Sequence, residues 1–200
     1  GSINSLTVTP DGKIIVSGNS DNTIKLWEAN SGKQIQVIKG HSSNINSVAI
    51  TADGKYIVSS DGAYGEAGTI KLWELKTGKE LRTFIGHRDK VNSVAITPDG
   101  KYIVSSGNWD GTIRLWEVSS GKELRIFSEH MGRVDSVVLT PDGKYIVNTD
   151  GSTIKLWEIS SGKLLQIFEG HSKSINSIAI TPDGKYIVSG SLDNRIKIWE

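Results

Sequence analysis

One phrase of six residues ends five stretches of this 200-residue chain. Its copies run over Thr23 to Glu28, Thr69 to Glu74, Thr112 to Glu117, Thr153 to Glu158 and Arg195 to Glu200, and each finishes with Trp-Glu. The tryptophans, at positions 27, 73, 116, 157 and 199, are 46, 43, 41 and 42 residues apart. A period in this range indicates a repeat protein, whose units are too small to bury a core alone and must pack on their neighbours.

The third copy shows how one unit is built. Val91 to Ile96 predicts a first strand, and Thr97 to Gly100 predicts a type I turn followed by a residue with positive φ. The stretches Lys101 to Ser105, Thr112 to Trp116 and Leu124 to Phe127 predict three more strands. Because short connections make consecutive strands neighbours, each unit is predicted to be a four-stranded antiparallel sheet.

Both faces of such a sheet are predicted to be buried. In the first strand of the third unit, the small residues Ser93 and Ala95 share one face, and Val94 and Ile96 share the other. A face of small residues is expected where another sheet approaches closely. The sheets should therefore stack around an axis.

The order of Gly-His, three strands and a closing Trp-Glu resembles the WD40 repeat of β-propellers. Gly-His occurs at Gly40-His41, Gly86-His87 and Gly170-His171, with Glu129-His130 as a variant. The resemblance implies an all-β chain that forms one β-propeller array over residues 1–200, with repeats at about 1–40, 41–86, 87–129, 130–170 and 171–200. The first three strands occur five times but the fourth only four times, so the last of the five four-stranded antiparallel blades should lack its outer strand.

In that family a histidine, a serine or threonine, an aspartate and the tryptophan form a hydrogen-bonded set. The full sets that the resemblance implies here are His87, Ser105, Asp110 and Trp116, and His171, Ser189, Asp193 and Trp199. In the second unit Ala67 stands where the aspartate belongs, and Asp61 is the candidate to replace it. The fourth unit has Asn148 in the serine position and Asp150 displaced, and in the first the histidine would precede residue 1.

Recurrent histidines, serines and aspartates also suggest a catalytic triad or a metal cluster. Each histidine holds the same place in its unit, however, so a propeller would spread the four around a ring, too far apart to share a metal. Repetition in every blade is better explained by the need to satisfy buried polar groups. The Gly-Lys pairs lack a phosphate-binding loop, and the Asp-Gly turns lack alternating oxygen ligands for calcium. We therefore expect no enzyme activity, no cofactor and no metal.

Composition narrows the class of partner. The 23 basic and 22 acidic residues are interspersed and leave a formal charge of +1, which gives no support for nucleic acid or an anionic membrane surface. No apolar run approaches the length of about 20 residues that spans a bilayer. The chain has no cysteine and therefore needs no oxidising compartment to form disulfides. We expect a cytoplasmic location, because a reducing cytosol is compatible with such a chain.

Loops on one propeller face are the expected platform for protein partners, because loops carry recognition while strands carry packing. The candidate partner-binding residues are Tyr64, Arg88, Lys90, Trp109, Met131, Arg133, Lys173 and Leu192, with Ser43 and Asn44 in the same loops. Trp109 stands outside the repeated phrase, and an exposed tryptophan beside arginines has the composition of an interface hot spot. Its ring lying over its own loop is the alternative. The loop from Asp61 to Gly68 is interpreted as a tolerated insertion.

Two functional hypotheses follow. The first is a protein-interaction scaffold that uses one propeller face. The second is a structural or engineered unit that assembles with copies of itself, or with a complementary propeller fragment, through unburied blade faces at its two ends. Three origins are compatible with five blades: a piece of a longer bacterial-type propeller, an engineered piece, and a complete five-bladed ring.

Overall fold

Five antiparallel sheets, which we call blades 1 to 5, follow one another along the chain in a computed structural model that describes residues 1–128 and 132–200. Blade 1 consists of β1 (Ile3–Val8), β2 (Ile14–Asn19), β3 (Thr23–Glu28) and β4 (Gln34–Lys39), and blade 2 of β5 (Ile45–Ile50), β6 (Tyr56–Asp61), β7 (Thr69–Glu74) and β8 (Glu80–Ile85). Blade 3 consists of β9 (Val91–Ile96), β10 (Tyr102–Gly107), β11 (Ile113–Glu117) and β12 (Glu123–Phe127). Blade 4 consists of β13 (Val137–Leu139), β14 (Tyr145–Asp150), β15 (Thr153–Glu158) and β16 (Leu164–Phe168), and blade 5 of β17 (Ile175–Ile180), β18 (Ile187–Ser191) and β19 (Ile196–Trp199).

The fold class predicted from the repeat is confirmed. Blades 1 to 4 have four strands in sequential order, and blade 5 has three, so its outer strand is absent as expected. The predicted turn is also present, because the glycine that ends it has a positive φ in every blade, for example 70° at Gly100. That conformation is open to glycine at little cost.

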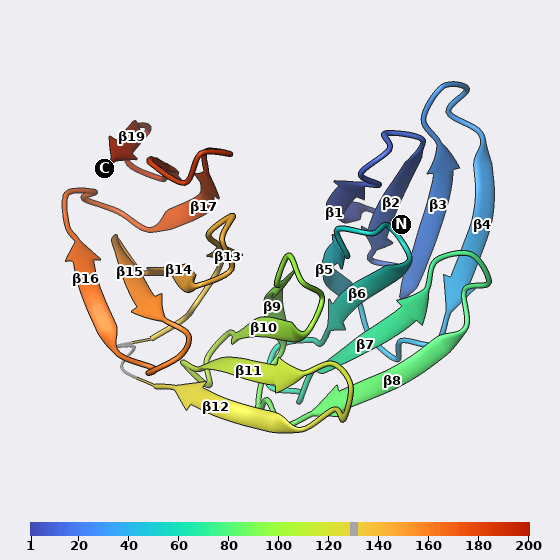
Figure 1. The fold of residues 1–200 in the computed structure, drawn as a ribbon, viewed down its shortest axis with the longest axis horizontal. Coiled ribbons are helices and arrows are strands. Elements are labelled where there is room, and N and C mark those ends of the chain that lie inside the picture. Colours follow the sequence, from blue (N-terminus) through green and yellow to red (C-terminus); the bar gives the residue numbers. More distant parts are fainter. Residues whose placement is uncertain (129–131) are drawn as a thin grey trace.

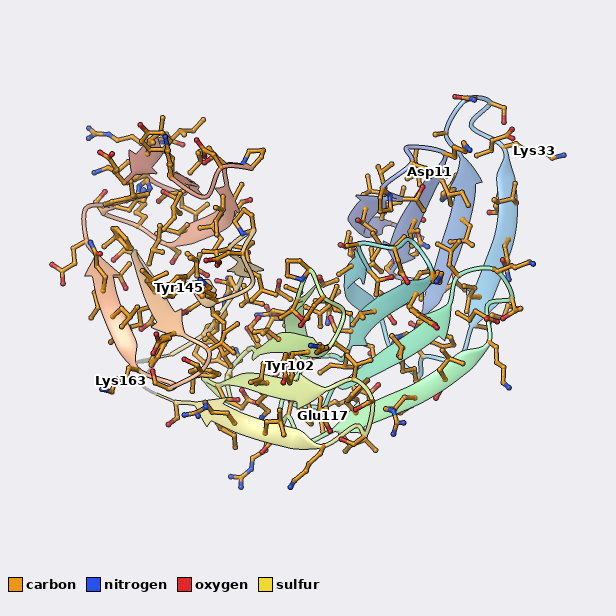
Figure 2. The ribbon with its side chains drawn as sticks, in the orientation of Figure 1. Asp11, Lys33, Tyr102, Glu117, Tyr145 and Lys163 are labelled. Atoms are coloured by element: carbon orange, nitrogen blue, oxygen red, sulfur yellow. The ribbon has the colours of Figure 1, made fainter. Side chains whose placement is uncertain are left out.

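The blades are arranged in an open arc (Figure 1). The first strands, β1, β5, β9, β13 and β17, line its inner side, and the fourth strands, β4, β8, β12 and β16, form its outer rim (Figure 1). Figure 2 shows side chains filling the spaces between neighbouring sheets, whereas Lys33 and Lys163 point away from the rim. The two ends of the arc are blade 1 and blade 5.

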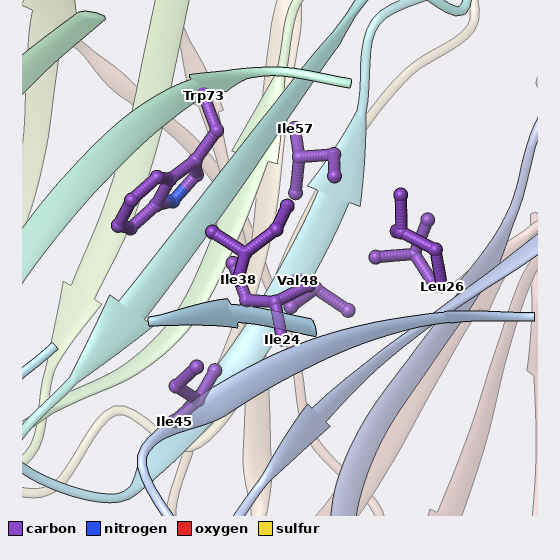
Figure 3. Packing of buried hydrophobic residues seen from close by; sticks show 8 residues of the cluster. Ile24, Leu26, Ile38, Ile45, Val48, Ile57 and Trp73 are labelled. Carbon is purple, nitrogen blue, oxygen red and sulfur yellow. The ribbon is translucent and has the colours of Figure 1, made fainter. Parts of the chain in front are cut away.

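The hydrophobic core is divided among the four junctions between consecutive blades. At the first junction, Ile24, Leu26 and Ile38 of blade 1 pack against blade 2. Ile45, Val48, Ile57 and Trp73 complete the contact from the other side (Figure 3). Full burial of a Leu, Ile or Val side chain contributes about 1.5–3 kcal/mol, so packing on a neighbour stabilises each blade.

Two recurrent side chains, a serine and an asparagine, form hydrogen bonds with the backbone of the neighbouring blade and so join the inner strands. The backbone N–H of Val94 donates to Ser47 Oγ of the preceding blade (3.3 Å), and that of Val137 donates to Ser93 Oγ (3.3 Å). Asn46 Nδ2 donates to the carbonyl of Val91 in the next blade (3.1 Å). The small face predicted for the first strand is therefore where the next blade approaches.

Candidate functional site

A chain of hydrogen bonds crosses blade 3 from its third strand to the loop after β10. The Nε1–H of Trp116 donates to Ser105 Oγ (2.8 Å), and this hydroxyl lies 2.7 Å from His87 Nε2, to which it donates. The other ring nitrogen, Nδ1, lies 2.7 Å from Asp110 Oδ2. With the imidazole proton on Nδ1, every donor in this chain has an acceptor.

Blade 5 repeats the arrangement with similar lengths. Trp199 Nε1–H donates to Ser189 Oγ (2.9 Å), and Ser189 Oγ lies 2.8 Å from His171 Nε2. His171 Nδ1 lies 2.7 Å from Asp193 Oδ2, which also accepts the backbone N–H of Ser172 (3.1 Å). The four residue types thus take the same places in both blades.

The aspartates of these networks are held in the charged form. Burial by itself would raise the pKa of Asp193, but hydrogen bonds from His171 and the backbone of Ser172 outweigh it and lower the pKa to about 2. The pKa of Asp110 is likewise well below its usual range, because the contacts with His87 and backbone N–H groups outweigh burial. Each carboxylate therefore orients a histidine and closes the end of a loop.

These networks have the connectivity of a catalytic relay but are inaccessible. Ser105 and Ser189 are 0% and 1% exposed, and each hydroxyl already accepts an indole N–H. A nucleophile has to reach a substrate carbonyl, which a fully buried hydroxyl cannot do. Within residues 1–128 and 132–200, no three His, Cys, Asp or Glu side chains are grouped so that they could hold a metal ion.

An open hollow of about 670 Å³ lies on the face that carries the loops between second and third strands. Trp109 of blade 3 lines it together with Arg133 of blade 4 and Leu192 of blade 5. The Trp109 side chain is 65% exposed and that of Leu192 is 54% exposed. Arg133 Nε lies 2.7 Å from Asp135 Oδ1, so a charged pair lines the hollow together with the two apolar side chains.

The other candidate residues lie outside this hollow. Lys90 Nζ lies 4.0 Å from the ring centroid of Tyr64, so these two side chains of neighbouring blades form a separate cation–π contact. Arg88 and Lys173 are exposed and do not line the hollow. Met131 falls outside the described residues.

The sequence matches the profile of the WD domain, G-beta repeat family over residues 1–28, 32–74, 78–117, 121–158 and 162–200. These segments and the five sheets place the same repeat on the chain five times. The chain belongs to the WD40-repeat family. Propellers of this family generally serve as protein-interaction scaffolds and are typically non-enzymatic.

Two individual relatives match over stretches about as long as one repeat. Cilia- and flagella-associated protein 52 of Sus scrofa is 44% identical over 45 residues, which are 22% of this chain and 7% of that protein. An uncharacterized WD repeat-containing protein of Nostoc sp. is 42% identical over 43 residues, 22% of this chain and 3% of that protein. The described part of the chain contains no helix with the length and apolar character needed to cross a membrane.

Three WD40 repeats depart from the full polar set, and the structure shows what replaces it. In blade 2, Asp61 stands in for the expected aspartate, because its Oδ2 lies 2.9 Å from His41 Nδ1 and its Oδ1 accepts the Thr69 backbone N–H. In blade 4, Asn148 Oδ1 accepts the Trp157 indole N–H (2.8 Å), and Asp150 pairs with Lys155 instead. His130 lies outside the described residues.

In blade 1, Ser17 Oγ accepts the Trp27 indole N–H (2.9 Å). The amide of Asn19 donates to the carbonyl of Thr23 (2.8 Å) and closes the loop after β2. The indole bond is therefore kept in a blade whose repeat has no histidine within residues 1–28.

Sequence reasoning missed Asp135, Ser174 and the residues 150–153 that also line the hollow. Asp135 could have been found, because the other four WD40 repeats have asparagine at its place: Asn4, Asn46, Asn92 and Asn176. At this place Asn46 and Asn92 donate to a backbone carbonyl of the next blade, and a carboxylate cannot donate such a bond, so the exchange to Asp135 changes the chemistry of the position. The opposite face has grooves lined by Tyr56 and Arg82 and by Tyr102 and Arg125, so there the same groove simply recurs from blade to blade.

Proposed function

We propose that the chain is a non-enzymatic scaffold that binds a protein partner in the hollow formed by Trp109, Arg133, Asp135 and Leu192. The observation that carries this proposal is the exposure of Trp109 and Leu192 on one concave surface built by three blades. Tryptophan and arginine are among the residue types most enriched at interface hot spots. The proposed partner presents an apolar side chain between them and a polar group to the Arg133–Asp135 pair.

The non-repeated character of the hollow supports its use for recognition. The position of Trp109 is occupied by Ser20 in blade 1 and Leu192 in blade 5, whereas the residues of the core recur in every blade. Side chains that leave the repeat pattern without serving the core are free to provide specificity. Charges interspersed along the chain favour protein over nucleic acid or membrane, and a cytoplasmic location is part of the same proposal, since the chain has no cysteine to form disulfides.

A peptide selection tests this proposal even before a natural partner is identified. Peptides selected on the immobilised chain from a random display library are measured against the chain and the variants Trp109→Ala and Leu192→Ala. We expect Trp109→Ala to weaken binding at least tenfold, about 1.4 kcal/mol, because a hot-spot side chain is removed. Melting temperatures should remain unchanged, since both side chains are exposed.

The matched control is Ile85→Ala, which removes an apolar side chain that is 74% exposed on the outer strand β8. It should leave the affinity unchanged. Selected peptides that bind Trp109→Ala within about 0.5 kcal/mol of the original chain would remove the hollow from the interface.

A further inference from the structure

The arginine that lines the hollow is held by the protein at one nitrogen only. Arg133 Nε donates to Asp135 Oδ2 (2.9 Å) and lies 2.7 Å from Asp135 Oδ1. Within residues 1–128 and 132–200, its two terminal nitrogens, Nη1 and Nη2, have no hydrogen-bond or ion-pair partner. The N–H groups of these two nitrogens lie in one plane, so this edge of the guanidinium is open to a second acceptor.

The carboxylates of the hollow, in contrast, are already engaged. Among the described residues, Asp135 and Asp150 are the acidic side chains that line it. Asp135 binds Arg133 Nε, and Asp150 Oδ2 lies 2.6 Å from Lys155 Nζ in a pair whose side chains are both 8% exposed. The charged group that the described lining leaves open is therefore a cationic donor, and it fits an acceptor with negative charge.

Two further cations lie beside the apolar side chains of the hollow. The backbone N–H of Arg88 donates to Asp110, the residue that follows Trp109 (3.0 Å). The Lys173 carbonyl accepts the hydroxyl of the residue that precedes Leu192 (2.9 Å). Both basic side chains are exposed, and in the described part of the chain neither is paired with a carboxylate. Such charges attract a negatively charged partner and speed its association.

The Arg–Asp pair belongs to blade 4 alone. Its two places are taken by Lys90 and Asn92 in blade 3 and by Ser174 and Asn176 in blade 5. The lysine of blade 3 lies over the ring of Tyr64 instead, 4.0 Å from its centroid. Arginine and aspartate thus depart from the repeat together, which fits a joint role at the hollow rather than in the packing that all blades share.

We propose that the partner of the hollow is an acidic peptide segment, in which an Asp or Glu carboxylate binds Nη1 and Nη2 of Arg133. An apolar side chain next to this carboxylate packs on Trp109 and Leu192. The inference rests on the function proposed above and specifies the chemistry of the partner. Because Asp135 occupies Nε, the carboxylate is bound by the terminal edge, where two parallel N–H groups match its two oxygens.

The peptides selected on the chain test this inference when one group is removed on each side. We expect the selected peptides to carry an Asp or Glu close to an apolar residue. Replacing that acid by its amide should weaken binding to the original chain at least about tenfold. Against Arg133→Gln the same replacement should cost less than about twofold, because the group that binds the carboxylate is already gone. Isothermal titration measures all these affinities.

Arg133→Lys separates the shape of the guanidinium from its charge. A lysine keeps the positive charge but lacks two parallel N–H groups, so the acidic peptide should bind this variant at least about threefold more weakly than the original chain. The matched control is Lys33→Gln, which removes a positive charge that points away from the outer rim and should leave the affinity unchanged (Figure 2). The Arg133 side chain is 40% exposed, so the melting temperatures of all variants should agree.

The outcomes distinguish this inference from the proposed function. If Trp109→Ala weakens binding but the acid and amide peptides bind the original chain equally well, the hollow is the interface and the carboxylate contact is overturned. Selected peptides without an acidic residue would overturn it too. A loss that is equal in the original chain and in Arg133→Gln would place the carboxylate away from Arg133. Binding that ignores Trp109→Ala and the amide alike would reject the hollow itself.

Discussion

At the scale of single residues, the repeated serines and histidines of the polar sets are buried and hold the fold, for example Ser105 and His87. Ser105 is the centre of one polar set, because it accepts the indole N–H of Trp116 and donates to His87. Glycine precedes the histidine for a steric reason, since a Cβ at Gly86 would lie 2.8 Å from the Trp116 ring. The glycine, the histidine, the serine and the tryptophan of one blade are thus mutually dependent positions.

Removing the central hydroxyl should destabilise the chain more than removing an exposed one. Ser105→Ala leaves a buried indole N–H and a histidine nitrogen without their partner, and each unsatisfied group costs about 1–3 kcal/mol. We expect the free energy of unfolding measured in urea to fall by at least about 1 kcal/mol. Ser119→Ala, in an exposed turn, should change it by less than about 0.5 kcal/mol, and equal effects would refute a structural role for the network.

The lowered pKa of Asp193 predicts a pH dependence. Its ordinary value of 3.8 falls to about 2 in the folded chain, so its ionised form stabilises the fold above pH 3.8. This contribution is lost as the pH falls through about 2, because the unfolded chain takes up the proton first. Asp193→Asn should lose less stability than the original chain between pH 5 and pH 2 in urea titrations. Parallel curves for both proteins would show that the carboxylate does not titrate in this way.

At the scale of elements, the turn between the first and second strands is the same in all five blades. In blade 2 the Thr51 hydroxyl donates to Asp53 (2.6 Å), and the Gly54 N–H donates to the Thr51 carbonyl (2.8 Å). Blade 3 has the same two bonds, with Pro98 at the position that Ala52 takes in blade 2. The backbone around Ala52 is therefore already suited to proline.

Ala52→Pro should stabilise the chain by about 0.4–1 kcal/mol, because proline restricts the unfolded chain while the folded turn is unchanged. The matched control is the reverse exchange, Pro98→Ala, which should destabilise by a similar amount. Both are measured as the free energy of unfolding in urea. A destabilised Ala52→Pro would show that the two turns differ in backbone conformation.

The strands, the turns and the packing between blades can be predicted from the sequence because the same residues recur in every repeat. A repeated residue such as the glycine of each turn reports a backbone requirement that recurs in every blade, so several copies test one interpretation. Where one copy lacks a repeated residue, the side chain that replaces it is decided by which groups lie within hydrogen-bonding distance in the folded chain. Asp61 replaces the missing aspartate of blade 2, as the sequence suggests, whereas the pairing of Asp150 with Lys155 is visible only in the structure.

At the scale of the whole molecule, the arc places unlike loops side by side, which sequence reasoning can only partly anticipate. The repeat assigns Trp109, Arg133 and Leu192 to one face, and the structure brings them into one hollow. Tyr64 and Lys90 are assigned to the same face but contact each other elsewhere. Which loops share a surface depends on the angle between blades, and a linear pattern does not contain that angle.

The central claim is that repeated residues maintain the fold while non-repeated residues at the hollow recognise the partner. Isothermal titration of one selected peptide against Trp109→Ala and Ser105→Ala, together with urea unfolding of both, tests this separation directly. We predict that Trp109→Ala loses at least tenfold in affinity at unchanged stability, and that Ser105→Ala loses stability but binds within about twofold of the original chain. The opposite pattern, with affinity lost through Ser105 and retained without Trp109, would contradict the account.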